Sequence, residues 1–345
     1  MLLDERARAR LLGHPGARAG AVIVAALVLF AALGPALSSH DPTASDFVRG
    51  AAPDTHTPVG PSFEFLLGTD RLFRDQLARL AYGARLSLLI AFAATAIACV
   101  LGAAVGIVAG YFEGSRGVTV PWPAIAGGAL SIAAAIGDHA AFAWTAAGAG
   151  GALSIAGAML GAARLQGGVR VNADVALMRL VDVGLAFPFL LLVMAVAAAL
   201  DRTTVTSILV VLGCTGWLGT ARIVRAKTMQ VRALDFVTAS RALGQGTARI
   251  LVRHVLPSIA GPLAAIATVS VAQMILAETA LSYLGAGIAP PTPTWGRMLF
   301  EGQDYYATAP WLVIAPAAAI FAAVLGFHLL GEGLRDALDP REARR

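Results

Sequence analysis

The amino-acid sequence predicts an all-α fold, a polytopic membrane helix bundle. Of its 345 residues, 57% are hydrophobic and 14% are charged, which leaves too few polar side chains to solvate the surface of a soluble domain. Several apolar runs are about 20 residues long, enough for a helix to cross a bilayer. The net charge is +5, and the basic residues lie at the ends of these runs, where membrane topology places them. The charge therefore does not indicate a nucleic-acid partner.

The first membrane anchor is predicted at residues 19–37. Residues 1–18 carry four arginines and are expected to form a cytoplasmic tail, because basic residues stay on that side. A cleaved signal peptide is the alternative. A retained anchor is favoured because no small-x-small cleavage site leads into a globular chain. Residues 38–85 are polar, rich in Asp, Pro and Gly, and expected to lie outside.

A second span is predicted at residues 86–112, and an apolar insertion follows at residues 116–171. The insertion is interpreted as two membrane segments, 121–136 and 140–163. The first is short for a span, so a re-entrant segment is the alternative. Because the basic residues that follow indicate a return to the cytoplasm, eight membrane segments are predicted in all. The insertion has few polar side chains and is expected to pack outside the solute path.

The remaining apolar runs predict four more spans, at residues 176–200, 207–223, 258–284 and 311–330. Pro188 is expected to bend the first of them, as neighbouring helices can satisfy the freed carbonyl. Asp182, Gln273 and Glu278 are polar groups within apolar runs, where burial is costly, so they are candidates for the translocation path or its gating. For Glu278, a hydrogen bond to a neighbour near the outer end of its helix is the alternative.

A polar, basic segment at residues 224–257 separates two of these spans and is predicted to be a cytoplasmic helix–turn–helix. Asp235 is expected to cap the first helix. Phe236, Ala239 and Leu243 recur at i, i+3 and i+7, which is one helical face. Short and apolar side chains of this kind favour a docking surface over a catalytic site.

The turn of this segment has its own signals. Gly244 stands where a left-handed C-terminal cap is needed. Thr247 is expected to cap the second helix, and Pro257 is expected to set the angle at which the chain enters the next span. The sequence therefore predicts two short helices with a tight, glycine-dependent turn between them.

This segment resembles the EAA loop of ABC-transporter permeases, in which three short residues precede a Gly by four positions and a Leu-Pro pair closes the motif. Residues 238–240 (Thr-Ala-Ser) stand in the triplet, Gly244 is the Gly, and Leu256 and Pro257 are the pair. The triplet lacks the Glu and the second Ala of the family motif, a version familiar in the peptide-transport branch. An ordinary loop between spans is the alternative. The resemblance implies an ATPase-coupling loop formed by Asp235, Phe236, Thr238, Ala239, Ser240, Gly244, His254, Leu256 and Pro257.

A second motif, GTDRLFRDQLARLAYGARLSL at residues 68–88, resembles the GTDxLGRDxLSRLxYGARxSL signature of peptide and nickel permeases. Phe73 stands where Gly is usual, which is a departure from the signature in the local turn. Residues 176–200, 275–299 and 331–341 resemble further signatures of the same family. The external residues that the resemblance singles out are Gly68, Thr69, Asp70, Arg74 and Asp75.

The resemblance implies the fold of ABC-importer permeases, with six family spans plus the two-segment insertion. It implies a subunit of an ATP-driven importer in a bacterial or archaeal cytoplasmic membrane, with both termini inside. The implied partners are a second homologous permease, two ABC ATPases and an external solute-binding protein. ATP and Mg²⁺ would be bound by the ATPases, with no cofactor or metal in this chain. The implied permease domain covers residues 86–331 and is followed by a cytoplasmic tail at 332–345.

The substrate class stays open, because relatives carry dipeptides, longer peptides, nickel chelates and opines. The sequence contains no G-x-x-x-x-G-K-[ST] loop, no H-E-x-x-H and no Cys/His cluster, so no motif supports catalysis. A membrane-embedded enzyme that uses Asp182 and Glu278 as an acid pair is the alternative from another class. An ion-coupled carrier is a further alternative, and it would need no docking loop.

Overall fold

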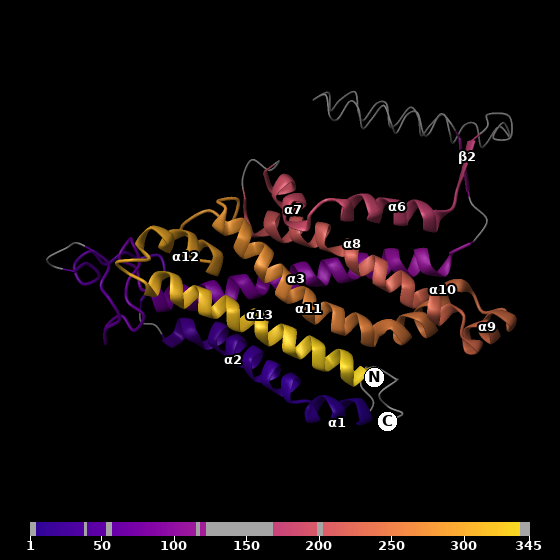
Figure 1. Cartoon of the computed structure of the whole chain (residues 1–345), viewed down its shortest axis with the longest axis horizontal. Helices are drawn as coiled ribbons and strands as arrows, with labels where there is room; N and C mark the ends of the chain where they lie inside the picture. Colours follow the sequence, from indigo (N-terminus) through magenta and orange to yellow (C-terminus); the bar gives the residue numbers. More distant parts are fainter. Residues whose placement is uncertain are drawn as a thin grey trace. The chain divides into compact units, whose positions relative to one another are not determined.

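The computed structural model describes residues 5–37, 40–52, 57–114, 118–121, 168–198 and 203–338 (Figure 1). It divides into two compact units: unit 1 comprises Met1–Ile107 and Val181–Arg345, and unit 2 comprises Val108–Leu180. The elements, in chain order, are α1 (Glu5–Gly13), α2 (Pro15–Leu37), α3 (Gln76–Tyr111), β1 (Val118–Pro121), β2 (Gly168–Val171), α6 (Ala173–Ala186), α7 (Phe189–Ala198), α8 (Val205–Arg232), α9 (Asp235–Ala242), α10 (Thr247–Ile250), the π-helix η2 (Leu251–Val255), α11 (Leu256–Tyr283), α12 (Trp295–Gly302), the 3₁₀-helix η3 (Gln303–Tyr305) and α13 (Trp311–Leu338).

Within the described ranges, five helices are long and apolar enough to cross a membrane: α2, α3, α8, the helix from Thr247 to Tyr283, and α13. The pair α6 and α7 also passes this test and counts as a sixth if it is one broken span. The all-α membrane bundle is therefore confirmed. The two segments predicted within the insertion, 121–136 and 140–163, lie outside the described residues, apart from Pro121 in β1.

The α6–α7 pair is bent by 89°, which confirms the bend predicted at Pro188. Proline cannot donate a backbone hydrogen bond, and the residue before it is pushed out of the helical conformation. The helix therefore ends at Ala186 and a new one begins at Phe189. Such a break is tolerated at membrane depth where neighbouring helices or a cavity satisfy the freed backbone groups.

Small residues let α3 and α8 approach closely within unit 1. Gly102 and Gly106 are four residues apart, as in the G-x-x-x-G pattern of membrane helices. A Cβ at Gly102 would lie 2.7 Å from the Thr220 Cβ, and one at Gly106 would lie 2.6 Å from the Ala221 carbonyl oxygen. The core of α3 is otherwise lined by alanines that are fully buried, including Ala84, Ala91 and Ala94.

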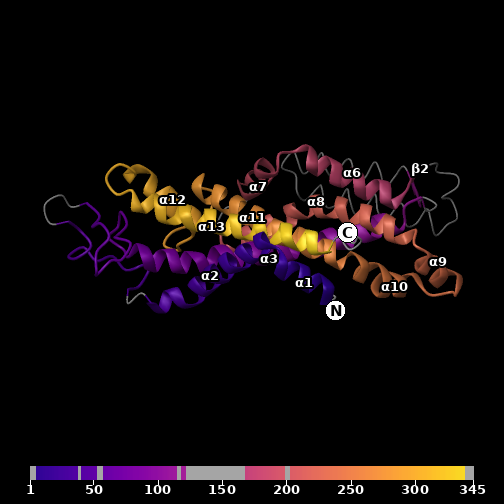
Figure 2. The same cartoon turned by 60° about the horizontal axis from the view of Figure 1, so that its bottom comes forward.

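The helix ends of unit 1 gather into two opposite groups. The loop before α3, the helix α12 and the start of α13 meet at one end, where the Trp311 Nε1–H donates to the Thr69 carbonyl at 3.2 Å. The start of α8 joins them, since the Thr203 hydroxyl donates to the Gly287 carbonyl at 2.6 Å. Figure 2 shows α12 and α9 at opposite ends of this unit. These are called the α12 end and the α9 end below.

Two short strands lie at the two ends of the insertion and depart from the all-helical prediction. β1 and β2 pair antiparallel, with Val118 opposite Val171 and Pro121 opposite Gly168. The two ends of the insertion therefore meet in unit 2, so the insertion begins and ends at the same place. The helix that carries the predicted second span, α3, begins at Gln76, before residue 86, where the predicted span begins.

Candidate coupling surface and polar clusters

The first helix of the predicted docking segment, α9, begins one residue earlier than a cap at Asp235 would place it. The N-cap is Leu234, which makes no side-chain cap, and Asp235 is the first helical residue. The prediction that Asp235 caps this helix is therefore wrong. Its carboxylate instead lies in the first turn, where negative charge is favoured by the helix dipole.

Gly244 ends α9 with a positive φ of 75°, as predicted. The Gln245 N–H donates to the Ser240 carbonyl at 3.1 Å and the Gly244 N–H donates to the Arg241 carbonyl at 2.9 Å. This pair of bonds is the Schellman motif, which satisfies the last carbonyls of a helix and needs a left-handed residue. The turn after α9 therefore depends on a residue without a Cβ.

The second helix of the segment differs from the prediction in two ways. The cap is Gly246, with no side-chain hydrogen bond, and Thr247 is the first helical residue, so the predicted Thr247 cap is wrong. The chain also does not break before the next span. It continues through the π-helix η2 into α11, which has Pro257 at its start. Because proline lacks an N–H, the wider turn allows the helix to run on without the missing bond.

The face of α9 predicted from the i, i+3, i+7 pattern is exposed. Phe236, Ala239 and Leu243 all lie on the surface, with Leu243 at 81% exposure, whereas Val237 and Ser240 are buried against the body of unit 1. Leu234 and Leu256 add exposed apolar area beside this face. An exposed apolar patch on a polar segment marks an interaction surface. We call Phe236, Ala239 and Leu243 the coupling face.

His254 ties α9 to the π-helix behind it. The Ser240 hydroxyl donates its only proton to the Phe236 carbonyl at 2.7 Å, so the 3.4 Å contact between the Ser240 Oγ and the His254 Nε2 has the histidine as donor. The imidazole also lies beside the Phe236 ring, with centroids 6.0 Å apart. The coupling face is thus held from behind by a side chain at the start of the next span.

The candidate path residues separate into different surroundings. Asp182 on α6 forms an ion pair with Arg222 on α8, and both side chains are about half exposed. Gln273 lines a hollow of about 170 Å³ at the break between α6 and α7. Its other walls include Gly184, Leu185, Phe187, Phe189 and Met274. Pro188, which makes the break, therefore shapes this hollow.

Glu278 lies elsewhere. Its side chain is fully buried at the α12 end, where the Ser282 hydroxyl lies 2.8 Å from Oε1 and the Ser87 hydroxyl lies 3.3 Å from Oε2. Thr294 is a third hydroxyl partner. Hydroxyl groups contact this carboxyl group and join α3, α11 and α12, which fits the packing alternative. The carboxyl groups of Asp182 and Glu278 have separate partners, so the structure does not bring them together as an acid pair.

The predicted external signature forms a buried ion-pair cluster. The Arg74 Nε donates to the Asp70 carboxylate at 2.7 Å. Both Arg74 and Arg79 donate to one oxygen of Glu301, at 3.0 and 2.8 Å. Arg297 donates to the other oxygen at 3.0 Å. The cluster fastens the segment before α3 to α12, and such a network is costly to break because removing one partner leaves a buried charge.

The cluster contains residues that the sequence did not single out. Glu301 and Arg297 lie on α12, more than 200 residues from Arg79, and no local pattern connects them.

The signature residue Asp75 accepts from the Leu77 and Ala78 N–H groups and contacts His40 at 2.9 Å, so it caps α3.

Two further residues of the signature shape its backbone. Gly68 has a φ of 76°, and Phe73 has a φ of 59°. Phe73 thus adopts the left-handed conformation that a Gly would adopt more easily. Thr69 donates from its hydroxyl to the Gly50 carbonyl at 2.7 Å. Across the described residues, no group of three His, Cys, Asp or Glu side chains could hold a metal ion.

Comparison with known proteins defines the class of this chain. The described part of the chain is a bundle of apolar helices with a polar helix–turn–helix between α8 and α11. The family profile described as "Binding-protein-dependent transport system inner membrane component" matches residues 154–344. The profile described as "N-terminal TM domain of oligopeptide transport permease C" matches residues 5–53. The chain therefore belongs to the family of binding-protein-dependent transport system inner membrane components.

Several relatives resemble almost the whole chain. A putative peptide transport system permease protein of Brucella abortus is 31% identical over 332 residues, covering 96% of this chain and 90% of the relative. The di/tripeptide transport system permease protein DppC of Pseudomonas aeruginosa is 33% identical over 330 residues, covering 95% and 89%. The oligopeptide transport system permease protein OppC of Bacillus subtilis is 29% identical over 325 residues, covering 94% and 85%. The chain is thus a multi-pass inner-membrane permease subunit and not an enzyme.

Proposed function

We propose that this chain is one permease subunit of an ATP-driven importer that carries di- or oligopeptides across the cytoplasmic membrane. The names of its relatives, among them a di/tripeptide and an oligopeptide transport permease, support the peptide class. A nickel chelate or an opine is the second candidate, which the sequence resemblance leaves open. The observation that supports the coupling role best is the exposed coupling face on α9, with its glycine-dependent turn.

The α9 end is the cytoplasmic end in this proposal. Arg222, Arg225, Lys227 and Arg232 lie on the last turns of α8, directly before α9, and basic residues concentrate on the cytoplasmic side. Gly333 of α13 approaches Ala17 of α2, so both terminal helices end near each other at this side. The α12 end, including the ion-pair cluster, then faces outward.

Two ABC ATPases, each with its own ATP and Mg²⁺, would dock on the coupling face and on that of a second homologous permease. ATP binding draws the ATPases together, and α9 moves with them. Because Ser240 and His254 tie α9 to the start of α11, the motion passes directly into a membrane span. Alternating access then follows from two stable arrangements of the helix bundle, each favoured by one state of the ATPase dimer.

The hollow at the α6–α7 break lies in the solute path in this proposal. Discontinuous helices recur at binding sites of transporters because their unwound backbone can face a solute. The Gln273 amide supplies hydrogen-bonding capacity there, and the half-exposed Asp182–Arg222 pair lies on the same two helices, α6 and α8.

The coupling proposal is tested by placing a charge on the coupling face. Leu243→Asp should abolish co-purification of the ATPase subunits, because a carboxylate would be desolvated in an apolar interface. Tyr306→Asp is the matched control, since Tyr306 is 72% exposed but belongs to the α12 end. Retention of the ATPases by a folded, membrane-inserted Leu243→Asp protein would contradict the coupling role.

A further inference from the structure

The segment before α3 exposes large apolar side chains in a region that is not a membrane-crossing helix. We call the described residues between Asp46 and Phe73 the N-terminal lobe. Five of its side chains are open to solvent, and Val48 and Phe63 have 88% and 104% exposure. Isolated exposed apolar residues are ordinary, but a group of them on one small lobe indicates a binding surface. The five residues, called the apolar patch below, are Phe47, Val48, Phe63, Leu66 and Leu72.

Contacts within the lobe bring these residues together from separate stretches of chain. The Asp46 N–H donates to the Phe73 carbonyl at 3.0 Å, and the Phe47 and Phe73 rings meet edge to face at 5.5 Å. The Arg49 guanidinium reaches Glu64 at 3.0 Å. The stretches that carry Val48, Phe63 and Leu72 are therefore neighbours in space.

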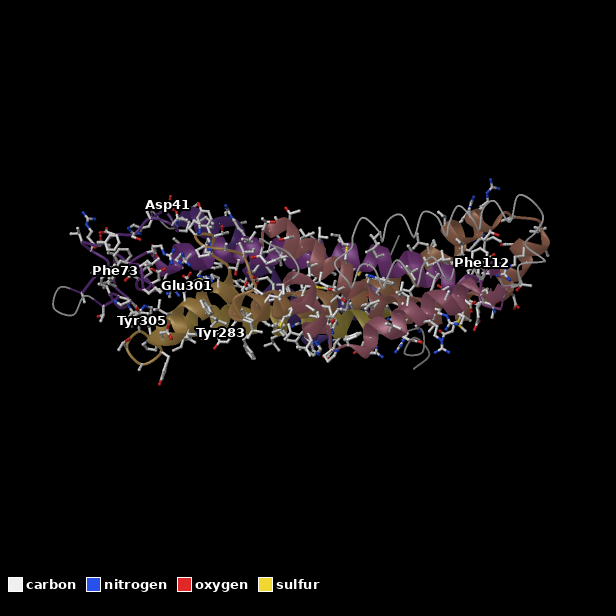
Figure 3. All side chains as sticks on the ribbon, turned by 90° about the horizontal axis from the view of Figure 1, so that it is seen from above. Asp41, Phe73, Phe112, Tyr283, Glu301 and Tyr305 are labelled. Atoms are coloured by element: carbon white, nitrogen blue, oxygen red, sulfur yellow. The ribbon has the colours of Figure 1, made fainter. Side chains whose placement is uncertain are left out.

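The patch rests on a rigid base. Beneath it, Thr69 bonds to the Gly50 carbonyl, and Trp311 of α13 bonds to Thr69. The buried ion-pair cluster fixes Asp70 and Arg74 to Glu301 of α12. Figure 3 shows Phe73 and Glu301 at the same end of unit 1. A surface that is ordered before binding loses less conformational entropy when a partner arrives.

Charges among the patch residues decide between a lipid and a protein partner. The Arg49–Glu64 ion pair is solvent-exposed and lies directly beside Val48 and Phe63 in the chain. The Arg49 N–H bond to the Asp46 carboxylate holds the pKa of Asp46 below its usual range, and the Thr43 hydroxyl has the same effect on the pKa of Asp41. These groups stay ionised. Insertion of the patch into hydrocarbon would desolvate them at high cost, whereas a protein interface keeps such charges hydrated at its rim.

From this geometry we infer that the apolar patch is the surface through which the extracytoplasmic solute-binding protein contacts this chain. The family description names a binding protein on which transport depends, and the inference rests on the proposed outward orientation of the α12 end. Asp46 next to Phe47 and the exposed Asp41 a few residues before it favour a partner face with apolar side chains ringed by lysine or arginine.

The test measures ATP hydrolysis by the reconstituted transporter while the purified binding protein of the same system is added. Phe63→Ser and Val48→Ser should each raise the half-saturating concentration of binding protein about tenfold or more, since truncated central side chains carry most of the affinity. The maximal stimulated rate and the rate without binding protein should not change. Tyr306→Ser, which alters a largely exposed aromatic side chain outside the lobe, should leave the half-saturating concentration unchanged.

Other outcomes would overturn the inference. An unchanged half-saturating concentration in both lobe variants would do so, as would an equal rise in Tyr306→Ser. A fluorophore on Phe63→Cys, in a background with Cys99 and Cys214 replaced by serine, distinguishes a lipid partner. Its emission should shift on adding the binding protein, and a shift on reconstitution into phosphatidylcholine–phosphatidylglycerol vesicles alone would contradict a protein partner. Failure of the ATPases to assemble with the unmodified chain would instead contradict the proposed function.

Discussion

Gly244→Val perturbs the turn behind the coupling face at one defined point. The residue has a φ of 75°, and this left-handed conformation costs an L-residue roughly 1–2 kcal/mol. A Cβ built there meets no atom within 4 Å, so the cost comes from the backbone and not from a clash. If the backbone relaxed to relieve that strain, it would break the two hydrogen bonds in which the Ser240 and Arg241 carbonyls are acceptors. A change of this size shifts the population of the native turn by a factor of roughly 5–30.

Gly244→Val should therefore insert into the membrane normally but lose most of its binding-protein-stimulated ATP hydrolysis and its peptide uptake. Gly246→Val is the matched control. Gly246 also has open space around its Cβ position, but its φ of −64° suits any residue, so coupling should survive. Normal uptake by a stably expressed Gly244→Val protein would refute the reasoning. An equal loss in Gly246→Val would show that bulk in the loop, and not backbone conformation, is what matters.

Three other perturbations have definite expected outcomes. Glu301→Gln removes the charge of a buried carboxylate that three arginines share and should lower the free energy of unfolding by about 3–5 kcal/mol. Asp182→Asn, in an exposed pair, should change it by about 1 kcal/mol or less. Thermal unfolding in detergent compares the two variants, and similar losses would contradict the distinction. His254→Gln retains an N–H donor and should keep coupling, while His254→Phe lacks that donor and should reduce coupling. The ratio of uptake to ATP hydrolysis measures coupling, and equal ratios in the two variants would show that the N–H donor at position 254 is irrelevant. Deletion of residues 116–171 should leave solute selectivity unchanged in competition uptake assays, and an altered range of solutes would place the insertion on the path.

Features that depend on neighbours in the sequence were predictable. The long helices follow from apolar runs, because a span must satisfy its backbone within one segment. The bend at Pro188 and the positive φ of Gly244 follow from the restricted chemistry of proline and the freedom of glycine. The exposed face of α9 follows from the helical period, which needs only eight residues to show.

Helix caps and side-chain partners were less predictable. Asp235 and Thr247 are both good capping residues, yet each lies one position inside its helix. Capping by a side chain is worth only about 1 kcal/mol, and the tertiary placement of the chain outweighs it. Phe73 keeps the left-handed turn of the usual glycine for the same reason: the lobe around it, including the contact with Phe47, holds the backbone in place.

The polar clusters could not be predicted because they join distant parts of the chain. A carboxylate within an apolar run, such as Glu278, has the same local signature whether it lines a path or packs against hydroxyl groups. Only the three-dimensional arrangement shows that Ser87 reaches it across 191 positions. The same holds for Glu301, which is inconspicuous in the sequence but receives bonds from Arg74, Arg79 and Arg297.

The position of these clusters bears on how motion would pass through the subunit. α11 has 28 residues and is about 42 Å long at 1.5 Å per residue. It begins beside His254, which holds α9, and its last turns carry Glu278, which bonds to α3 and lies beside α12. Because the α12 end is held by buried hydrogen bonds and ion pairs, a displacement of α9 should move α11 together with α3 and α12 as one body. The break between α6 and α7, with its hollow and its exposed Asp182–Arg222 pair, has fewer such ties. We therefore expect the relative movement that opens a path to occur at the break, between α6–α7 and the helices that α11 carries with it.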